Sequence, residues 1–159
     1  MATPNELLRT FRKHLPGFDA AAAKKGLKAS RRAVGYRMLN EVAPSRSMRE
    51  PRRRWFSDDD FDLVVWFSDS GSIAGFELCY DKSHAERALI WSSSGGYGHF
   101  RVDTGERTPL KNLTPILVAD GALAKDRVIA GFLEVSKNLD PAIRSFVIAR
   151  LQEYPSGRD

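Results

Sequence analysis

The sequence predicts an α+β fold: a four- to five-stranded antiparallel meander covered by two C-terminal helices, with a basic helical segment at the N-terminus. Three observations lead to this prediction. Apolar and polar residues alternate between residues 61 and 103, which is typical of strands. Turn residues divide that stretch into hairpins. Apolar residues recur at helical spacing after residue 125, so strands precede helices instead of alternating with them.

Length and composition indicate one globular domain. The chain has 159 residues, of which 42% are hydrophobic and 28% charged, so it can bury a core without disulfide or metal. No apolar run reaches the roughly 18 residues of a membrane-spanning helix, and the first residues lack the pattern of a secretory signal. The single cysteine, Cys79, favours a reducing compartment. We therefore expect a cytoplasmic protein; a transit peptide in the first third is the alternative.

Positive charge is concentrated at the N-terminal end. Residues 1–54 hold 14 Lys and Arg against 4 Asp and Glu, a net charge of +10, whereas residues 55–159 hold 11 against 16, a net charge of −5. We therefore divide the domain into a basic helical segment with linker, 1–54, and an α+β core, 55–159. This asymmetry indicates contact with nucleic acid or another acidic partner. The alternative is a basic segment that lies against the acidic remainder of its own chain.

The basic segment predicts a helix and then a linker. Thr3 and Glu6 form a capping box around Pro4, and Pro16 ends the helix. Its apolar side carries Leu7, Leu8, Phe11 and Leu15, and its polar side Arg9, Arg12 and Lys13. Residues 44–54 contain two prolines and many arginines, which is typical of an exposed linker.

The first predicted hairpin joins strands 61–68 and 73–81 through a two-residue turn at Ser70-Gly71. Its cross-strand pairs are Phe61 with Tyr80, Leu63 with Leu78, Val65 with Phe76 and Trp66 with Gly75. A shift of one residue would place Glu77 among the apolar partners, which a buried face excludes.

The second predicted hairpin joins strands 87–93 and 97–103 through a two-residue turn at Gly95-Gly96. This turn pairs Leu89 with Val102 and Trp91 with Phe100. Together the hairpins define an apolar core face: Phe61, Leu63, Val65, Phe67, Phe76, Leu78, Tyr80, Leu89, Trp91, Phe100 and Val102.

The layer that covers this face is predicted at the C-terminus. Residues 114–119 form a fifth strand or an extended arm. A helix over about 125–138 has the apolar stripe Val128, Phe132, Val135 and Leu139. Asp140 and Pro141 begin a last helix. Its apolar residues are Ile143, Phe146, Val147, Leu151 and Tyr154.

The opposite face of the sheet is predicted to be chemically mixed: Asp62, Val64, Trp66, Glu77, Cys79, Ala88, Ile90, Ser92, His99 and Arg101. One hypothesis is a ligand or catalytic pocket, with Trp66, Glu77 and Arg101 facing the ligand. In a catalytic version, His99 is the acid or base, Cys79 the nucleophile, and Asp62 or Glu77 the orienting carboxylate. The alternative is a half-buried surface under the N-terminal helix, with Glu77 and Arg101 paired at its rim.

The sequence predicts no metal site and no cofactor. Its three histidines and one cysteine lack the paired spacing of zinc ligands. The glycines after Ser93 lack the following Lys-Ser/Thr of a phosphate loop, and strands flank them.

The predicted anion-binding residues precede the first strand: Arg46, Arg49, Arg52, Arg53 and Arg54. They lead into Trp55-Phe56, and arginines beside aromatic residues suit phosphate contact with base stacking. No DNA- or RNA-binding motif accompanies them. The sequence favours a binding protein over an enzyme, with nucleic acid or an acidic protein as its partner and no membrane partner. A structural or self-associating domain is the third hypothesis.

Overall fold

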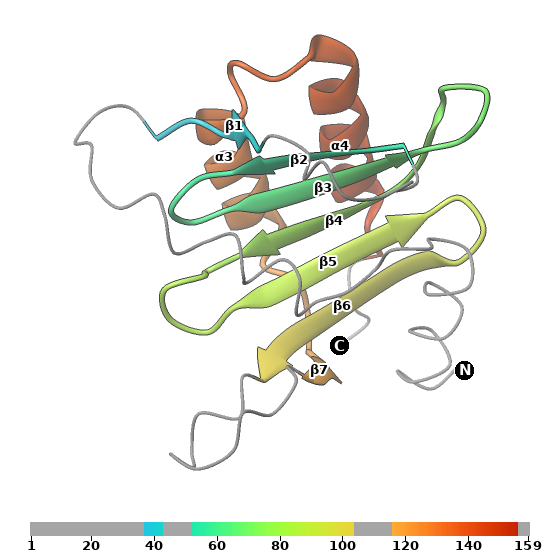
Figure 1. Cartoon of the computed structure of the whole chain (residues 1–159). Coiled ribbons are helices and arrows are strands. Elements are labelled where there is room, and N and C mark those ends of the chain that lie inside the picture. The colour runs from blue at the N-terminus through green and yellow to red at the C-terminus, as the bar shows by residue number, and fades with distance from the viewer. Residues whose placement is uncertain (1–36, 43–51, 104–115, 156–159) are drawn as a thin grey trace, which may run out of the picture.

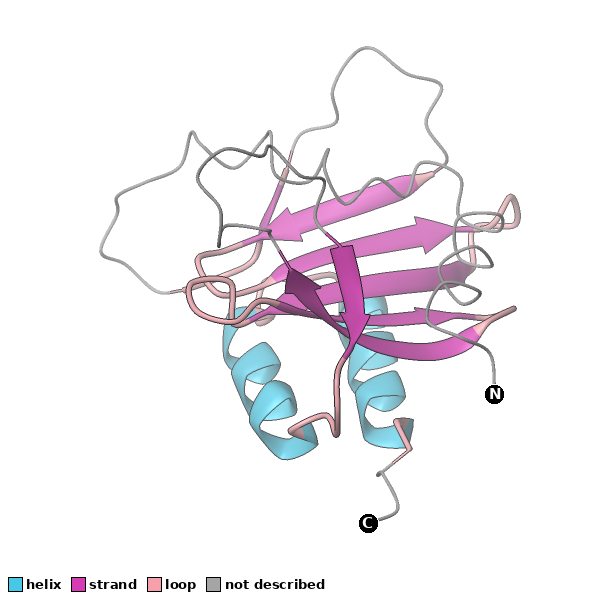
Figure 2. Ribbon diagram, turned by 90° about the horizontal axis from the view of Figure 1, so that it is seen from below, coloured by secondary structure: helices cyan, strands magenta, loops and turns pink. Residues whose placement is uncertain are grey.

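The computed structural model describes residues 37–42, 52–103 and 116–155 (Figure 1). These residues form an antiparallel sheet with two helices packed on one of its faces (Figure 2). The predicted α+β architecture is confirmed at this level. The helix expected near the N-terminus and most of the expected linker lie outside the described residues.

Seven strands form the described sheet, in the order β1 to β7, and every neighbouring pair is antiparallel. Their bounds are Asn40–Glu41 for β1, Arg53–Ser57 for β2, Asp62–Phe67 for β3, Ile73–Tyr80 for β4, Arg87–Ser92 for β5, Gly96–Asp103 for β6 and Ile116–Ala119 for β7. The meander is longer than the four or five strands expected. The additional strands, β1 and β2, lie at its N-terminal end.

Strand β2 corrects the interpretation of Arg53 and Arg54 as linker. It pairs with β3 along its whole length. Its residues alternate between the two faces: Phe56 is buried against the helices, whereas Trp55 points to the opposite side with Val64. The flanking arginines carry no hydrophobic signal, so this period-two pattern was not visible as a strand.

The register predicted for the first hairpin is confirmed for Leu63 with Leu78, Val65 with Phe76 and Trp66 with Gly75. The two-residue turn is wrong. A bulge between Trp66 and Phe67 shifts the pairing, and the amide of Ser68 donates to the carbonyl of Ser72 at 2.8 Å. Gly71, at φ +84°, ends the loop that this bond closes, a common geometry of three-residue hairpin loops.

The register predicted for the second hairpin is wrong. The observed pairs are Leu89 with His99 and Trp91 with Tyr97, where Val102 and Phe100 were expected. The chain turns earlier, so that β6 begins at Gly96, and of the two adjacent glycines Gly96 alone has a positive φ, of +70°. The displacement is an odd number of residues. It therefore moves every β6 side chain to the other face of the sheet.

Helices α3 (Lys125–Val135) and α4 (Pro141–Glu153) supply the predicted covering layer. Their buried residues are Val128, Phe132 and Val135 in α3 and Ile143, Val147 and Leu151 in α4. Asp140 caps α4 as expected, because its carboxylate accepts from the Ala142 amide at 2.8 Å. Neither helix is long and apolar enough to cross a membrane, and the same holds throughout the described ranges.

The two faces of the sheet carry separate apolar clusters. We call the face under α3 and α4 the helix face and the opposite one the second face. The helix face joins the sheet to both helices and contains most of the predicted core residues, from Phe61 to Leu89. The second face gathers Trp66, Ala88, Ile90 and Phe100, with Val64, Cys79 and Val102 packed against them. Phe100 and Val102, expected in the main core, lie on the second face because of the β6 register.

Candidate functional site

The residues predicted to form a catalytic group are separated by the sheet. His99 contacts Tyr80 of the helix-face cluster, whereas Cys79 packs in the second-face cluster and Glu77 lies on the same side as Cys79. A pair of Cys79 as nucleophile and His99 as base therefore does not form. Arg101 alternates with Phe100 and shares the side of His99, so the expected ion pair between Glu77 and Arg101 does not form either.

Glu77 occupies the middle of the second face. It lies on the central strand β4, between Val64 of β3 and Ile90 of β5. The pKa of its carboxyl is raised to about 7, chiefly by burial and to a smaller extent by the carboxylates of Asp62 and Glu86, whereas the hydrogen bond from Cys79 lowers it. A group that titrates near neutral pH is suited to acid–base work or to holding a cation.

Cys79 is a neighbour of Glu77 rather than a nucleophile. Its thiol donates to the Glu77 Oε1 at a distance of 3.3 Å. Burial raises the pKa of the thiol well above its ordinary value, and the adjacent negative charges act in the same direction. Because the thiolate is the reactive form, this raised pKa disfavours Cys79 as a nucleophile at neutral pH.

An enclosed ion pair borders the second face. Lys82, in the loop after β4, donates to the Asp62 Oδ1 at 2.9 Å and to the Asp58 carbonyl at 2.6 Å. The side chains of Lys82 and Asp62 are only 9% and 11% exposed. Lys82 therefore compensates the charge of Asp62. Glu77 has a weaker hydrogen-bond donor than Asp62, because its donor is a thiol.

His99 forms a buried cross-link on the helix face. Its Nδ1 lies 3.0 Å from the Gly121 carbonyl, which can only accept, so the proton of the neutral ring is on Nδ1. Its Nε2 then accepts from the Tyr80 hydroxyl at 2.6 Å. Burial lowers the pKa of His99 and raises that of Tyr80 to about 12, which keeps both groups neutral at pH 7.

A chain of ion pairs surrounds this cross-link. Arg127 of α3 holds both carboxylate oxygens of Asp81, at 2.8 and 2.7 Å. Arg87 of β5 contacts Asp81 at 3.2 Å and Asp120 at 2.5 Å. Asp81 has a φ of +56°, a conformation that few residues other than glycine adopt but that aspartate tolerates. The network ties the ends of β4, β5 and β7 to α3.

This polar cluster is suited to stabilising the fold and not to acid–base catalysis. Both ring nitrogens of His99 are engaged, and each charged group around it has an opposite charge beside it. Sequence reasoning missed Asp81, Arg87 and Arg127. Their contacts join residues up to 46 positions apart, and only the strand registers could have revealed them.

The predicted anion-binding arginines divide into two groups. Arg46 and Arg49 lie outside the described residues. Arg52 is exposed and donates to the Asp69 carbonyl at 3.4 Å, and Arg53 begins β2. Arg54 makes contacts within the fold. It donates two hydrogen bonds to Glu41, each of 2.8 Å, and its guanidinium lies 5.0 Å from the centre of the Phe56 ring. Binding of an anion by Arg54 would compete with Glu41.

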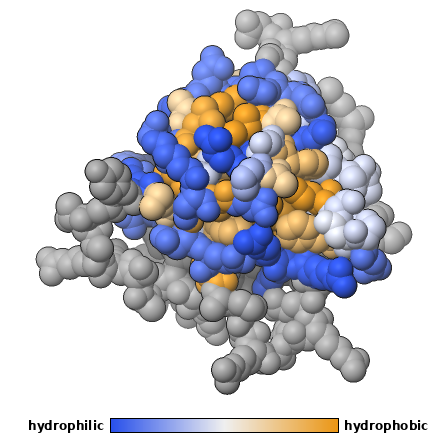
Figure 3. All heavy atoms as spheres, turned by 90° about the horizontal axis from the view of Figure 1, so that it is seen from above, coloured by the Kyte–Doolittle hydropathy of each residue, from blue (hydrophilic) through white to orange (hydrophobic). Residues whose placement is uncertain are grey.

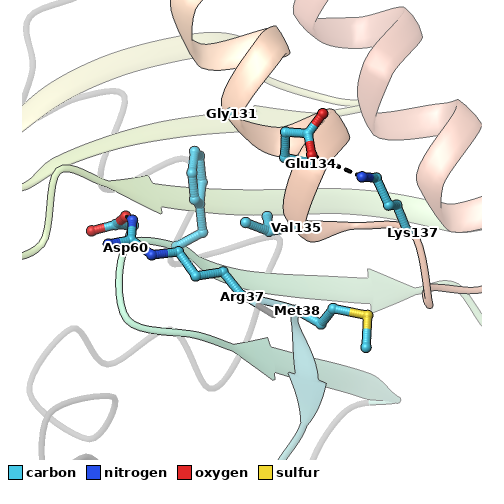
Figure 4. A pocket seen from close by; sticks show the side chains of 8 residues that line it. Arg37, Met38, Asp60, Gly131, Glu134, Val135 and Lys137 are labelled. Atoms are coloured by element: carbon cyan, nitrogen blue, oxygen red, sulfur yellow. Dashed lines mark hydrogen bonds and ion pairs between the residues drawn. The ribbon is translucent and has the colours of Figure 1, made fainter. Parts of the chain in front are cut away.

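A pocket of about 450 Å³ opens between the β1 end of the sheet and α3. It is lined by Arg37, Met38, Asp60, Phe61, Gly131, Glu134, Val135 and Lys137 (Figure 4). Viewed from above the sheet as drawn in Figure 1, hydrophobic residues form an area that hydrophilic residues surround (Figure 3). Arg37 pairs with Asp60 and Lys137 with Glu134, so the charges at the pocket compensate one another.

No metal centre is formed within the described ranges, where no cluster of three or more His, Cys, Asp or Glu could hold an ion. Comparison of the chain with protein-family models, with curated proteins and with solved structures gave no match.

Proposed function

We propose that the protein is a binding module whose basic N-terminal third contacts an anionic macromolecule, nucleic acid first, while the sheet and its helices act as a scaffold. The observation that carries this proposal is the distribution of charge. The described residues hold 12 Lys and Arg against 15 Asp and Glu, a net charge of −3, whereas the whole chain has +5. The excess of positive charge thus lies outside the scaffold.

The contacts of the scaffold support this division. Seven of its cations contact carboxylates: Arg37, Arg54, Lys82, Arg87, Arg127, Lys137 and Arg150. Paired cations are poor ligands for phosphate, because an existing partner must first be displaced. The exposed Arg52, near the end of the basic segment, contacts a carbonyl and no carboxylate among the described residues, so it remains suited to a phosphate.

Base stacking is not part of the proposal. Phe56 is 3% exposed and belongs to the helix-face core, and Trp55 packs beside Val64 on the second face. The expected contact is therefore with phosphate groups, which carry no sequence information. We expect binding of DNA and RNA with little preference for sequence, in a protein that we place in the cytoplasm.

A salt series on the full chain tests the proposal. We expect the affinity for a short labelled duplex to fall steeply between about 50 and 200 mM salt, because binding releases counterions. Arg49→Gln with Arg52→Gln is expected to weaken binding and to reduce the slope of log K against log salt by about 1 to 2. Fluorescence anisotropy measures both quantities.

The matched control is Arg101→Gln with Lys137→Gln, which removes the same charge from exposed positions of the scaffold. This control is expected to leave the slope unchanged. Absence of binding at low salt, or equal slopes in the two double variants, contradicts the proposal.

A further inference from the structure

The second face is a covered surface whose cover does not come from the described helices. Ala88 and Ile90 are fully buried, Phe100 is 1% exposed and Trp66 3%. Both helices pack on the other side of the sheet (Figure 2). Side chains that project from the middle of a sheet reach such burial only under a further layer.

The chemistry of this face is apolar with a negative centre. Around Glu77 the neighbouring strands place Val64, Ile90 and Ala88, with Trp55 and Phe100 one strand further out. The described partner of the Glu77 carboxylate is a thiol, which is a weak donor. The indole Nε1 of Trp55 is also buried and has no acceptor among the described residues. A carboxylate in apolar surroundings is stabilised best by a cation.

We propose that the second face is the docking surface for this chain's own N-terminal segment, residues 1–36, with the apolar side of the helix predicted over residues 3–15 against Ile90 and Phe100 and a cationic side chain of the segment against Glu77. This assignment does not depend on the proposed function.

The length of the helix predicted over residues 3–15 and its apolar stripe both match the second face. A helix of residues 3–15 is about 20 Å long. The distance across the face from β2 to β6 is four strand spacings, or about 19 Å. The segment offers an apolar stripe of Leu7, Leu8, Phe11 and Leu15, which matches the apolar surface around Glu77.

Charge distinguishes this segment from the other stretches outside the described residues. Residues 1–36 contain 8 Lys and Arg against 2 Asp and Glu, a net charge of +6. Residues 43–51 and 104–115 each have a net charge of +1. The segment with the largest positive charge therefore complements a face that presents Glu77, with Asp62 and Glu86 near it.

Carbodiimide cross-linking of the full, unmodified chain is the first test. This reagent joins a carboxylate to a lysine amine in contact with it, and mass spectrometry identifies the joined peptides. We expect Glu77 to be linked to a lysine of residues 1–36, namely Lys13, Lys24, Lys25 or Lys28, and the link to be lost in Glu77→Gln. A link from Glu77 to Lys111, or no intramolecular link at Glu77, overturns the proposal.

Alkylation of the single cysteine is the second test, because Cys79 packs on this face. We expect Phe11→Asp to increase the labelling rate of Cys79 by about tenfold or more, as the transfer cost of a charged side chain would undock the segment. Leu110→Asp, in the stretch between β6 and β7, is the matched control and is expected to leave the rate unchanged.

Circular dichroism accompanies the labelling to confirm that each variant keeps its fold. Faster labelling in Leu110→Asp but not in Phe11→Asp assigns the cover to the other stretch and overturns the proposal. Unchanged labelling in both folded variants also overturns it. If Phe11→Asp does not fold, the cross-linking result on the unmodified chain decides.

Discussion

The two faces of the sheet differ in how well their polar groups are supplied with hydrogen-bond and ion-pair partners. On the helix face, the Tyr80 hydroxyl and both nitrogens of His99 have partners, and four charged side chains surround them in compensating pairs. On the second face, Glu77 lies among apolar side chains with a thiol as its donor. A buried polar group with strong hydrogen-bond partners stabilises one specific fold. A buried polar group with a weak partner is destabilising, and a further contact to it would lower the free energy.

The densest polar cluster among the described residues, around His99, disfavours ligand binding. The residues around His99 satisfy one another, so a ligand there would have to displace existing bonds. The environment of Glu77 is electrostatically incomplete within the described residues. Three experiments measure this difference, and they are described in order of decreasing change in stability.

The first compares one phenylalanine from each cluster. Phe132 is fully buried between α3 and the sheet. Phe132→Ala is therefore expected to lower the free energy of unfolding by about 3–5 kcal/mol. Phe100→Ala is expected to cost less, because a docked terminal segment can adjust to the lost volume more readily than a helix–sheet interface can. Denaturant unfolding measures both. Equal losses would show that the two faces are packed alike.

The second removes the charge of Glu77. Its folded pKa, about 7, lies above the unfolded value of about 4.3, so the folded state binds the extra proton and loses stability as pH rises from about 4.5 through 7. Glu77→Gln keeps an acceptor for Cys79 and is expected to be more stable than the unmodified chain above pH 7, by on the order of 1–3 kcal/mol. The cation that we propose to lie against Glu77 keeps this gain below the full effect of the raised pKa.

The two proteins are expected to converge below about pH 4.5, where Glu77 is protonated in both states. Glu134→Gln is the control, since Glu134 lies at the surface and pairs with the exposed Lys137. A stability difference for Glu77→Gln that does not change with pH would contradict the raised pKa.

The third removes the hydroxyl of Tyr80. Tyr80→Phe leaves the buried Nε2 of His99 without its donor, which is expected to cost about 1–3 kcal/mol in unfolding free energy. Tyr97→Phe is the matched control, because its hydroxyl donates to the Arg150 carbonyl in a half-buried position, where water can replace it. Thermal unfolding of both proteins checks the order, and a larger loss for Tyr97→Phe would reverse it.

The accuracy of the sequence analysis differed between the hairpins for a physical reason. Along β4 only one set of alternating residues is wholly apolar, so the register of the first hairpin was determined. Along β6 both sets are plausible, since Phe100 and Val102 alternate with Tyr97 and His99. The apolar pattern could not choose between them, and the adjacent glycines allowed more than one turn.

The candidate site was predictable only in part for the same reason. Glu77 and Cys79 were placed on the mixed face correctly, because they belong to the first hairpin. His99 was assigned to that face through the wrong register. The partners of Asp81 come from β5 and α3. No local sequence pattern predicts contacts between the ends of elements that are far apart in the sequence.

The order of the strands has a consequence for how the protein is made. Every pairing in the described sheet joins strands that are neighbours in the sequence, so each step closes only a short loop and costs little chain entropy. The sheet can therefore assemble hairpin by hairpin while the chain is still being synthesised. The apolar helix face stays uncovered until α3 and α4, which follow all the described strands, have left the ribosome. During that interval the nascent chain exposes a surface that chaperones recognise and that favours aggregation.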